Sequence, residues 1–163
     1  METAVELFQP ADLSACLELL NTHIATGTAN FSWQPETEAS LEHSFAEAVA
    51  GPYVAKANGE VIGYALAHPA FSKEAYRYCA ELTIYFKEGP HYGLARPLYQ
   101  AVEEELRAKD FVVLIACITD SNAPSLAFHE KLGFTLAGAL PRCGYKFGDW
   151  HGVVWYTRRL REV

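Results

Sequence analysis

The chain has 163 residues, of which half are hydrophobic, and its formal net charge is −7. This length predicts one domain, residues 1–163, with a buried core, and the composition excludes a disordered chain. The acidic balance, without any block of Lys or Arg, argues against nucleic acid as a partner. The longest apolar runs, such as VVLIACI at 112–118, are too short to span a bilayer, so we expect no membrane partner.

The opening METAVELF has no charged segment followed by an apolar stretch, so we expect no secretion signal. The cysteines lie in apolar surroundings without a CxxC pair, at positions 16, 79, 117 and 143. We expect buried free thiols in a reducing cytoplasm. No Cys/His spacing fits a zinc site, so we expect no metal.

The N-terminal third predicts a strand, a helix, a loop and a second helix. The expected ranges are 1–8, 10–25, 26–37 and 38–50, with Gly51-Pro52 ending the second helix. The loop carries Phe31 and Trp33, which are unusual in a connection. Their rings either cover the core or line a pocket or a subunit contact.

The rest of the chain alternates strands and helices. Asn58-Gly59 between two alternating runs predicts a hairpin. The expected strands are 53–57, 60–69, 75–86, 111–118, 134–141 and 152–160, and the expected helices are 93–111 and 121–134. Pro97 fits only the first turn of a helix, so that helix should begin near 93–95. This order predicts a mixed α/β (α+β) fold with helices packed on one central sheet.

The stretch EGPHYGLARPLYQ at 88–100 joins a strand to a helix through Gly93 and Ala95. Free backbone N–H groups and the helix dipole at such a junction can bind an anion without a basic side chain. An ordinary strand-to-helix turn has the same pattern. The stretch matches neither the GK[ST] phosphate loop nor GxGxxG.

Glu81 stands in the middle of a predicted strand. Alternation places it on one face with Cys79, Thr83 and Tyr85. A partly buried carboxylate there could be a general base with a raised pKa. The alternative is an exposed face, or an ion pair with Arg77 or Lys73.

Two C-terminal stretches are also informative. SNAPSLAFHEKLGF has a capping residue in Asn122 and a helix stop in Gly133. Its His129 is either a surface or packed histidine or a functional group. The glycines and aromatic residues of CGYKFGDWHGVVWY, Trp150 among them, indicate a tight turn into the last strand.

These pieces in this order resemble the GNAT family of acetyl-CoA-dependent N-acetyltransferases, and within it the phosphinothricin/methionine sulfone acetyltransferase branch. Five stretches carry the resemblance: NTHIATGTANFSWQPET at 21–37, AELTIYF at 80–86, HYGLARPLY at 91–99, DSNAPSLAFHEKLGF at 120–134 and GYKFGDWHGVVWY at 144–156. The resemblance implies the GNAT fold, a mixed sheet with helices on both faces. It also implies a homodimer that uses acetyl-CoA and acts on a small-molecule amine.

The resemblance further implies roles for matching positions. Glu81 would take a proton from the substrate ammonium, and His129 would protonate the departing CoA thiolate or assist proton traffic. The implied coenzyme contacts are Leu82, Thr83, Ile84, Tyr85, His91, Tyr92, Gly93, Leu94, Ala95, Arg96, Asn122 and Ser125. The implied substrate contacts are Phe31, Lys73 and Tyr76.

The sequence departs from the branch at two places. Lys73 replaces an Arg, which loses bidentate recognition of an anionic group. Pro90 stands where the family's loop has a basic or amide residue, and we expect weaker CoA affinity from this change. Two other readings stay open: a GNAT enzyme acting on a protein N-terminus or a polyamine, and a degenerate CoA-binding sensor. Lys73 argues against polyamines, and the retention of Glu81 and His129 argues against the sensor.

Overall fold

The computed structural model describes all residues, 1–163, and contains one seven-stranded sheet. The strands are β1 (Thr3–Leu7), β2 (Ala50–Ala57), β3 (Glu60–Pro69), β4 (Cys79–Phe86), β5 (Val113–Thr119), β6 (Thr135–Lys146) and β7 (Asp149–Arg159). The helices are α1 (Leu13–Thr26), α2 (Glu38–Ala46), α3 (Ala95–Ala108) and α4 (Ala123–Lys131), with short 3-10 turns at Pro10–Asp12 and Glu74–Tyr76.

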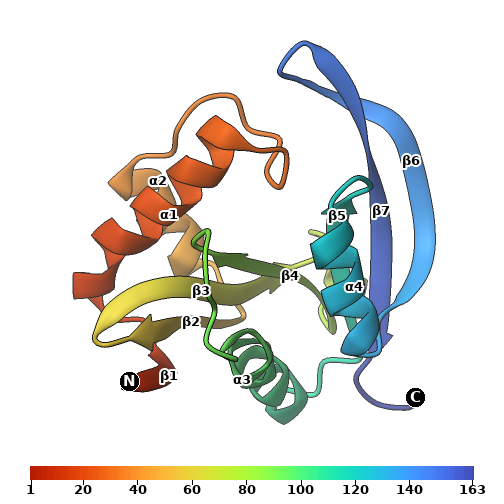
Figure 1. The fold of residues 1–163 in the computed structure, drawn as a ribbon. Helices are drawn as coiled ribbons and strands as arrows, with labels where there is room; N and C mark the ends of the chain where they lie inside the picture. The colour runs from red at the N-terminus through yellow and green to blue at the C-terminus, as the bar shows by residue number, and fades with distance from the viewer.

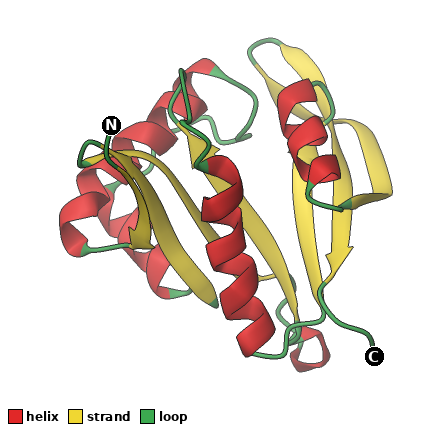
Figure 2. Ribbon diagram, turned by 60° about the horizontal axis from the view of Figure 1, so that its bottom comes forward, coloured by secondary structure: helices red, strands yellow, loops and turns green.

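The strand order is β1-β2-β3-β4-β5-β7-β6, and only the β4–β5 pair is parallel. Helices α1 and α2 cover one face of the β2–β4 strands and α3 covers the other (Figure 1). Figure 2 shows α3 over the β1–β4 half of the sheet and α4 over the β5–β7 half. The expected mixed sheet with helices on both faces is therefore confirmed.

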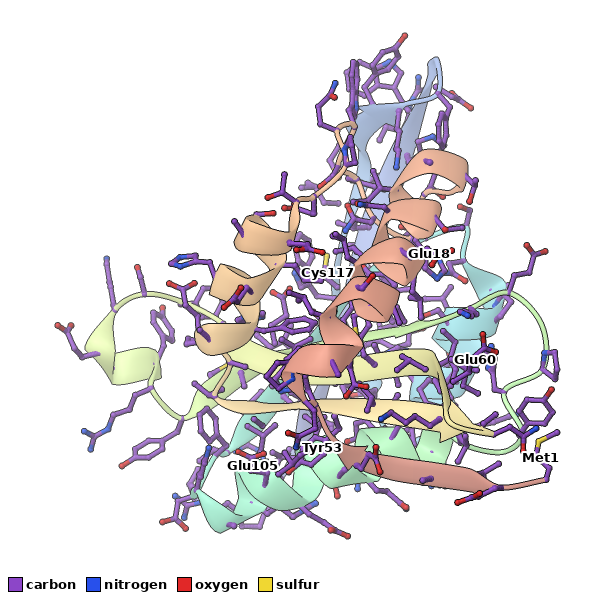
Figure 3. All side chains as sticks on the ribbon, turned by 90° about the vertical axis from the view of Figure 1, so that its left-hand side faces the viewer. Met1, Glu18, Tyr53, Glu60, Glu105 and Cys117 are labelled. Carbon is purple, nitrogen blue, oxygen red and sulfur yellow. The ribbon has the colours of Figure 1, made fainter.

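The larger core lies between the sheet and α3. Leu98, Val102 and Leu106 of α3 are fully buried there, at the helical spacing that the sequence predicts. Helix α3 is also tied to β2, because the Glu105 carboxylate accepts hydrogen bonds from the Tyr53 hydroxyl (2.7 Å) and the Gly51 N–H (2.9 Å) (Figure 3). A smaller core on the other face holds α1 and α2 against β2 and β3.

The second helix ends earlier than predicted. It stops at Ala46 rather than near residue 50, and Gly51-Pro52 lies inside β2. The Val49 N–H donates to the Ala67 carbonyl (2.8 Å), and Ala50 pairs with Ala67. Residues 49 and 50 therefore hydrogen-bond to β3, and the helix ends before the stop predicted at Gly51-Pro52.

The strand predicted at 75–86 begins only at Cys79, so the prediction is wrong for 75–78. The Tyr76 N–H donates to the Lys73 carbonyl (3.0 Å) and closes a tight turn. Residues 71–78 are exposed and have no core to pack against.

The last two strands are longer than predicted. They reach Lys146 and restart at Asp149 instead of stopping at 141 and restarting at 152. Phe147 and Gly148 both have positive φ, 54° and 74°, which suits a two-residue hairpin turn. The strands therefore stay paired up to the turn.

The cysteines are free thiols, as expected, but they are not all buried. Cys16 is buried and Cys79 is half-buried, whereas Cys117 and Cys143 are exposed. Cys143 lies at an irregularity in the edge strand β6, beside the charged residue Arg142. None of the helices is both long and apolar enough to cross a membrane.

The buried face of α3 gives a stability prediction. Leu106→Ala should lower the free energy of unfolding by about 2–5 kcal/mol, because it leaves a cavity in the larger core. The measurement is chemical denaturation. The matched control is Gln100→Ala, an exposed position on the same helix, which should change stability by less than about 0.5 kcal/mol. Equal effects of the two substitutions would contradict this account of the core.

Candidate active site

Strands β4 and β5 pair over only three positions before they part. Their register joins Cys79, Ala80 and Glu81 to Val113, Leu114 and Ile115. Beyond Glu81, β4 continues along β3, while β5 continues along β7. The two halves of the sheet therefore open like a fork, and Glu81 lies at its base.

The fork contains a cleft of about 910 Å³. Its walls come from the diverging parts of β4 and β5, the C-terminal half of α1, the connection from β4 into α3, and the first two turns of α4. Glu18 of α1 and Cys117 of β5 are two of its lining residues (Figure 3). Segments far apart in the sequence thus share one cavity.

The β4 backbone presents unpaired polar groups to this cleft. The Cys79 carbonyl accepts from Ala70 N–H (3.1 Å) and the Lys87 N–H donates to Ile62 (2.8 Å), so odd-numbered residues of β4 bond to β3. The backbone N–H and C=O groups of the even-numbered residues of β4 are then directed toward β5. The Ile84 N–H is consequently directed into the cleft with no strand opposite it.

The start of α3 supplies a second set of free amides. Neither Gly93, Ala95 nor Arg96 donates its backbone N–H to another backbone group. Gly93 has φ 73°, and the space where its Cβ would stand is empty. A ligand can therefore approach this backbone closely, and the helix dipole favours an anion there.

A lysine and a histidine lie near these amides. Lys87 and His91 line the cleft, and the His91 ring stacks on Phe86 with centroids 4.2 Å apart. Arg96 is exposed and donates from its guanidinium to the Lys131 carbonyl (3.3 Å), which ties α3 to α4. Lys87 and Arg96 thus place positive charge near the amides at the start of α3, although Pro90 itself carries none.

Glu81 is half-buried in the cleft. It forms no ion pair with Arg77, Lys73 or any other residue, so that alternative is wrong. Burial raises the pKa of its carboxyl group, and His68, its cross-strand neighbour, partly opposes the shift. A carboxylate of this kind can act as a general base near neutral pH.

His129 is buried in α4, 4% exposed, and also lines the cleft. Its Nδ1 lies 2.7 Å from the Ser125 carbonyl, which can only accept, so Nδ1 carries the proton. Desolvation lowers the pKa of the ring, and the Ser125 bond partly opposes it. The neutral ring then has a proton-accepting Nε2, which makes no hydrogen bond within the protein.

Asn122 and Ser125 lie at the start of α4 and line the cleft. The Asn122 side-chain oxygen accepts from the Ser125 N–H (3.3 Å), so Asn122 caps the helix as predicted. This bond fixes the amide group and leaves its NH₂ free for a ligand.

The structure brings together most of the site residues predicted from the sequence. The cleft lining includes Glu81, Leu82, Thr83, Ile84, Tyr85, His91, Ala95, Asn122, Ser125 and His129. Tyr92, Gly93, Leu94 and Arg96 belong to the same connection but are outside the lining.

The three predicted substrate contacts lie outside the cleft. Phe31 packs against Gly144, and its ring centroid is 6.2 Å from that of His151. Lys73 and Tyr76 are exposed on the connection between β3 and β4, and Tyr76 packs on Phe71 with ring centroids 4.7 Å apart.

Sequence reasoning missed several cleft residues. His23 of α1 donates from Nε2 to the Phe86 carbonyl (2.7 Å), and Lys87 and Cys117 also line the cavity. In β5, Cys117 stands between the buried residues Ala116 and Ile118, so strand alternation puts its side chain on the opposite face from theirs. This alternation is the one signal in the sequence that could have placed Cys117 on the same side as Glu81. Nothing in the helical pattern of α1 distinguishes His23.

Comparisons with known proteins identify the family of this chain. Residues 5–155 match the acetyltransferase (GNAT) domain. The phosphinothricin N-acetyltransferase of Streptomyces viridochromogenes is 34% identical over 152 residues, covering 91% of this chain and 82% of that protein. The L-methionine sulfoximine/L-methionine sulfone acetyltransferase of Pseudomonas aeruginosa is 32% identical over 145 residues, covering 86% and 84%.

Solved structures share the fold. The phosphinothricin acetyltransferase of Sinorhizobium meliloti in complex with AcCoA superimposes with a TM-score of 0.91 at 29% identity, over 98% of this chain and 89% of that one. A putative acetyltransferase from Salmonella typhimurium with its cofactor acetyl-CoA gives 0.92 at 26% identity, over 99% and 95%. The chain therefore belongs to the GNAT family of N-acetyltransferases, among the relatives of the phosphinothricin and methionine sulfoximine acetyltransferases.

Proposed function

We propose that the protein transfers an acetyl group from acetyl-CoA to the amino group of a small amino-acid-like substrate. The substrate is of the phosphinothricin or methionine sulfone/sulfoximine type, and the amine attacks directly in a ternary complex. One observation carries the proposal: Glu81 lies unpaired and half-buried at the base of the fork, in a cleft whose lining also includes Ala95 at the start of α3. The named activities of the relatives support the substrate class.

The residues present fit acetyl-CoA. In the proposal, the free N–H groups of Gly93, Ala95 and Arg96 hold the diphosphate, with Lys87 and His91 nearby. The Asn122 amide and Ser125 meet the coenzyme arm. The acidic chain thus binds an anion mainly through main-chain dipoles, which need no cluster of basic residues.

In the proposed reaction, Glu81 accepts a proton from the substrate ammonium, directly or through water. An α-ammonium group has a reference pKa near ~8. A carboxylate with a raised pKa shares this proton more readily than an ordinary one. The freed amine then attacks the thioester carbonyl, and the Ile84 N–H donates to the developing oxyanion.

Cys117 supports direct attack rather than an acetyl-cysteine intermediate. It is the one thiol in the cleft lining, and partial desolvation inside the cleft, with a further contribution from the Glu81 charge, raises its pKa to about 11. The thiolate is the nucleophilic form, and at neutral pH this thiol stays protonated.

His129 has a secondary part in the proposal. Its neutral ring offers a lone pair at Nε2, so it must gain a proton before it can give one to the departing thiolate. We therefore assign it to proton traffic within the cleft, where water can replace it.

A homodimer is the last part of the proposal. Lys73 and Tyr76 lie outside the cleft of their own chain, on an exposed connection with Phe71 and Tyr78. A partner's cleft would be the place where they meet a substrate, as the resemblance to the branch implies.

The first test is an amine panel. The protein with acetyl-CoA should release free thiol with phosphinothricin, methionine sulfone or methionine sulfoximine, and less with spermidine or short peptides. Thiol is measured colorimetrically, and a reaction without amine gives the background. Coenzyme binding without thiol release for any amine would instead identify a sensor.

The proposed base gives a kinetic prediction. Glu81→Gln should lower kcat by roughly 10²–10⁴-fold, whereas His129→Ala should lower it less. In the unaltered enzyme, activity should fall as the pH drops through a pKa above the ordinary carboxyl value, because protonated Glu81 cannot accept a proton. The acid limb should disappear in Glu81→Gln. A pH profile with its acid limb unchanged in that variant would place the base elsewhere.

The proposed diphosphate site at the start of α3 gives a binding prediction. Gly93→Val should weaken acetyl-CoA binding by at least about tenfold, because a side chain there occupies the open space beside the free amides. Isothermal titration calorimetry measures the dissociation constant. Gly59→Val is the matched control, since Gly59 has a similar positive φ, 79°, and open surroundings in the distant β2–β3 turn. Equal weakening in both variants would show a general effect of strain.

A further inference from the structure

A short segment after α1, residues 27–31, crosses the fork on the face where α1 lies. Thr119 of β5 donates from its hydroxyl to the Thr28 carbonyl (2.6 Å). Asn30 donates from its amide to the Tyr85 hydroxyl of β4 (3.2 Å). The segment therefore bonds to both strands after they part, and Ala29 between these two contacts lines the cleft. We name residues 27–31 the bridging segment.

Lys146, at the end of β6, anchors this segment. Its side chain is buried, with the residue only 3% exposed, and it forms no ion pair. The ammonium donates to the carbonyls of Ile24 (2.7 Å), Gly27 (2.8 Å) and Asn30 (2.7 Å). All three of its hydrogen-bond donors are thus used by the end of α1 and the bridging segment.

Further contacts join the β6–β7 hairpin to the same loop. Phe31 lies where a side chain at Gly144 would otherwise stand. The Trp33 indole N–H donates to the Tyr145 carbonyl (2.9 Å). Within the hairpin itself, His151 donates from Nε2 to the Lys146 carbonyl (3.0 Å). Residues 144–146 therefore hold the loop along its length, and Lys146 provides the one buried charge among these contacts.

A buried ammonium is unfavourable unless it is fully hydrogen-bonded, and here main-chain carbonyls satisfy it. Carbonyls at the C-terminus of a helix lack partners and carry partial negative charge, which suits a cation. The same arrangement fixes the bridging segment relative to both prongs of the fork.

We propose that Lys146 is a positioning residue, which holds the bridging segment across the fork and so fixes the amine side of the cleft beside Glu81. The inference rests on the proposed function. The contacts run from Lys146 to Asn30, from Asn30 to Tyr85, and along β4 to Glu81, whose side chain lies on the same face as that of Tyr85.

The proposed coenzyme groups of α3 and α4 are separate from these contacts. The free amides of α3 and the Asn122 cap of α4 make no hydrogen bond with the bridging segment. Loss of the Lys146 hydrogen bonds should therefore change the position of the amine and leave the affinity for the coenzyme unchanged.

Lys146→Met tests the proposal, because methionine has a similar length and no donors. We expect the KM for the amine to rise at least about tenfold and kcat to fall, as misplacement of a reactant predicts. The dissociation constant of acetyl-CoA, measured by calorimetry, should stay within about twofold. Amide hydrogen exchange should become faster in residues 27–31. Lys131→Met, an exposed lysine on α4, is the matched control and should match the unaltered enzyme in all these measurements.

Asn30→Ala is the second variant if Lys146→Met does not fold, since it removes only the side-chain bond to Tyr85. It should raise the amine KM in the same direction with unchanged acetyl-CoA binding. Unchanged amine kinetics in the folded variants, or equal losses of amine and coenzyme binding, would overturn the positioning role. Absence of activity in the unaltered enzyme would instead defeat the proposed function, and unchanged hydrogen exchange in Lys146→Met would then separately overturn the anchoring.

Discussion

The early end of the β4–β5 pairing is the constraint on which the rest of the structure depends. A parallel ladder that continued past Glu81 would use the Ile84 amide and fill the cleft with strand backbone. Each half of the sheet instead stays paired on its outer side, β4 with β3 and β5 with β7. The cleft is therefore built into the sheet, and side chains from α1, α3 and α4 complete it.

The two buried or half-buried charged groups near the fork, Glu81 and Lys146, have opposite surroundings. Glu81 is left without a partner, and its pKa rises because burial disfavours the charged form. Lys146 is surrounded by three carbonyls, and its ammonium serves as a fixed cross-link between a hairpin and a loop. In the proposed function, the group that exchanges a proton is unpaired, whereas the group that holds a segment has every donor engaged.

Much of the fold could be predicted from local pattern. The apolar spacing of α3, the Asn58-Gly59 hairpin and the Asn122 cap are short-range signals, and each holds in the structure. The errors arose where distant pairing overrides local preference. Ala67 draws residues 49 and 50 into the sheet before the expected helix stop, and β7 keeps β6 paired up to the turn at 147–148. The exposure of Cys117 likewise depends on the fork, which no window of neighbouring residues reveals.

The sequence by itself determined the family resemblance, the alternation that puts Glu81 and Tyr85 on one face, and a helix start after Gly93. These follow from residue spacing and backbone preference, which are local properties. Only the tertiary structure decided that Lys73 and Tyr76 lie outside the cleft, that His23 and Cys117 line it, and that Lys146 reaches the end of α1. Such placements depend on contacts across more than a hundred residues of chain, and they form only when the sheet and its covering helices pack together.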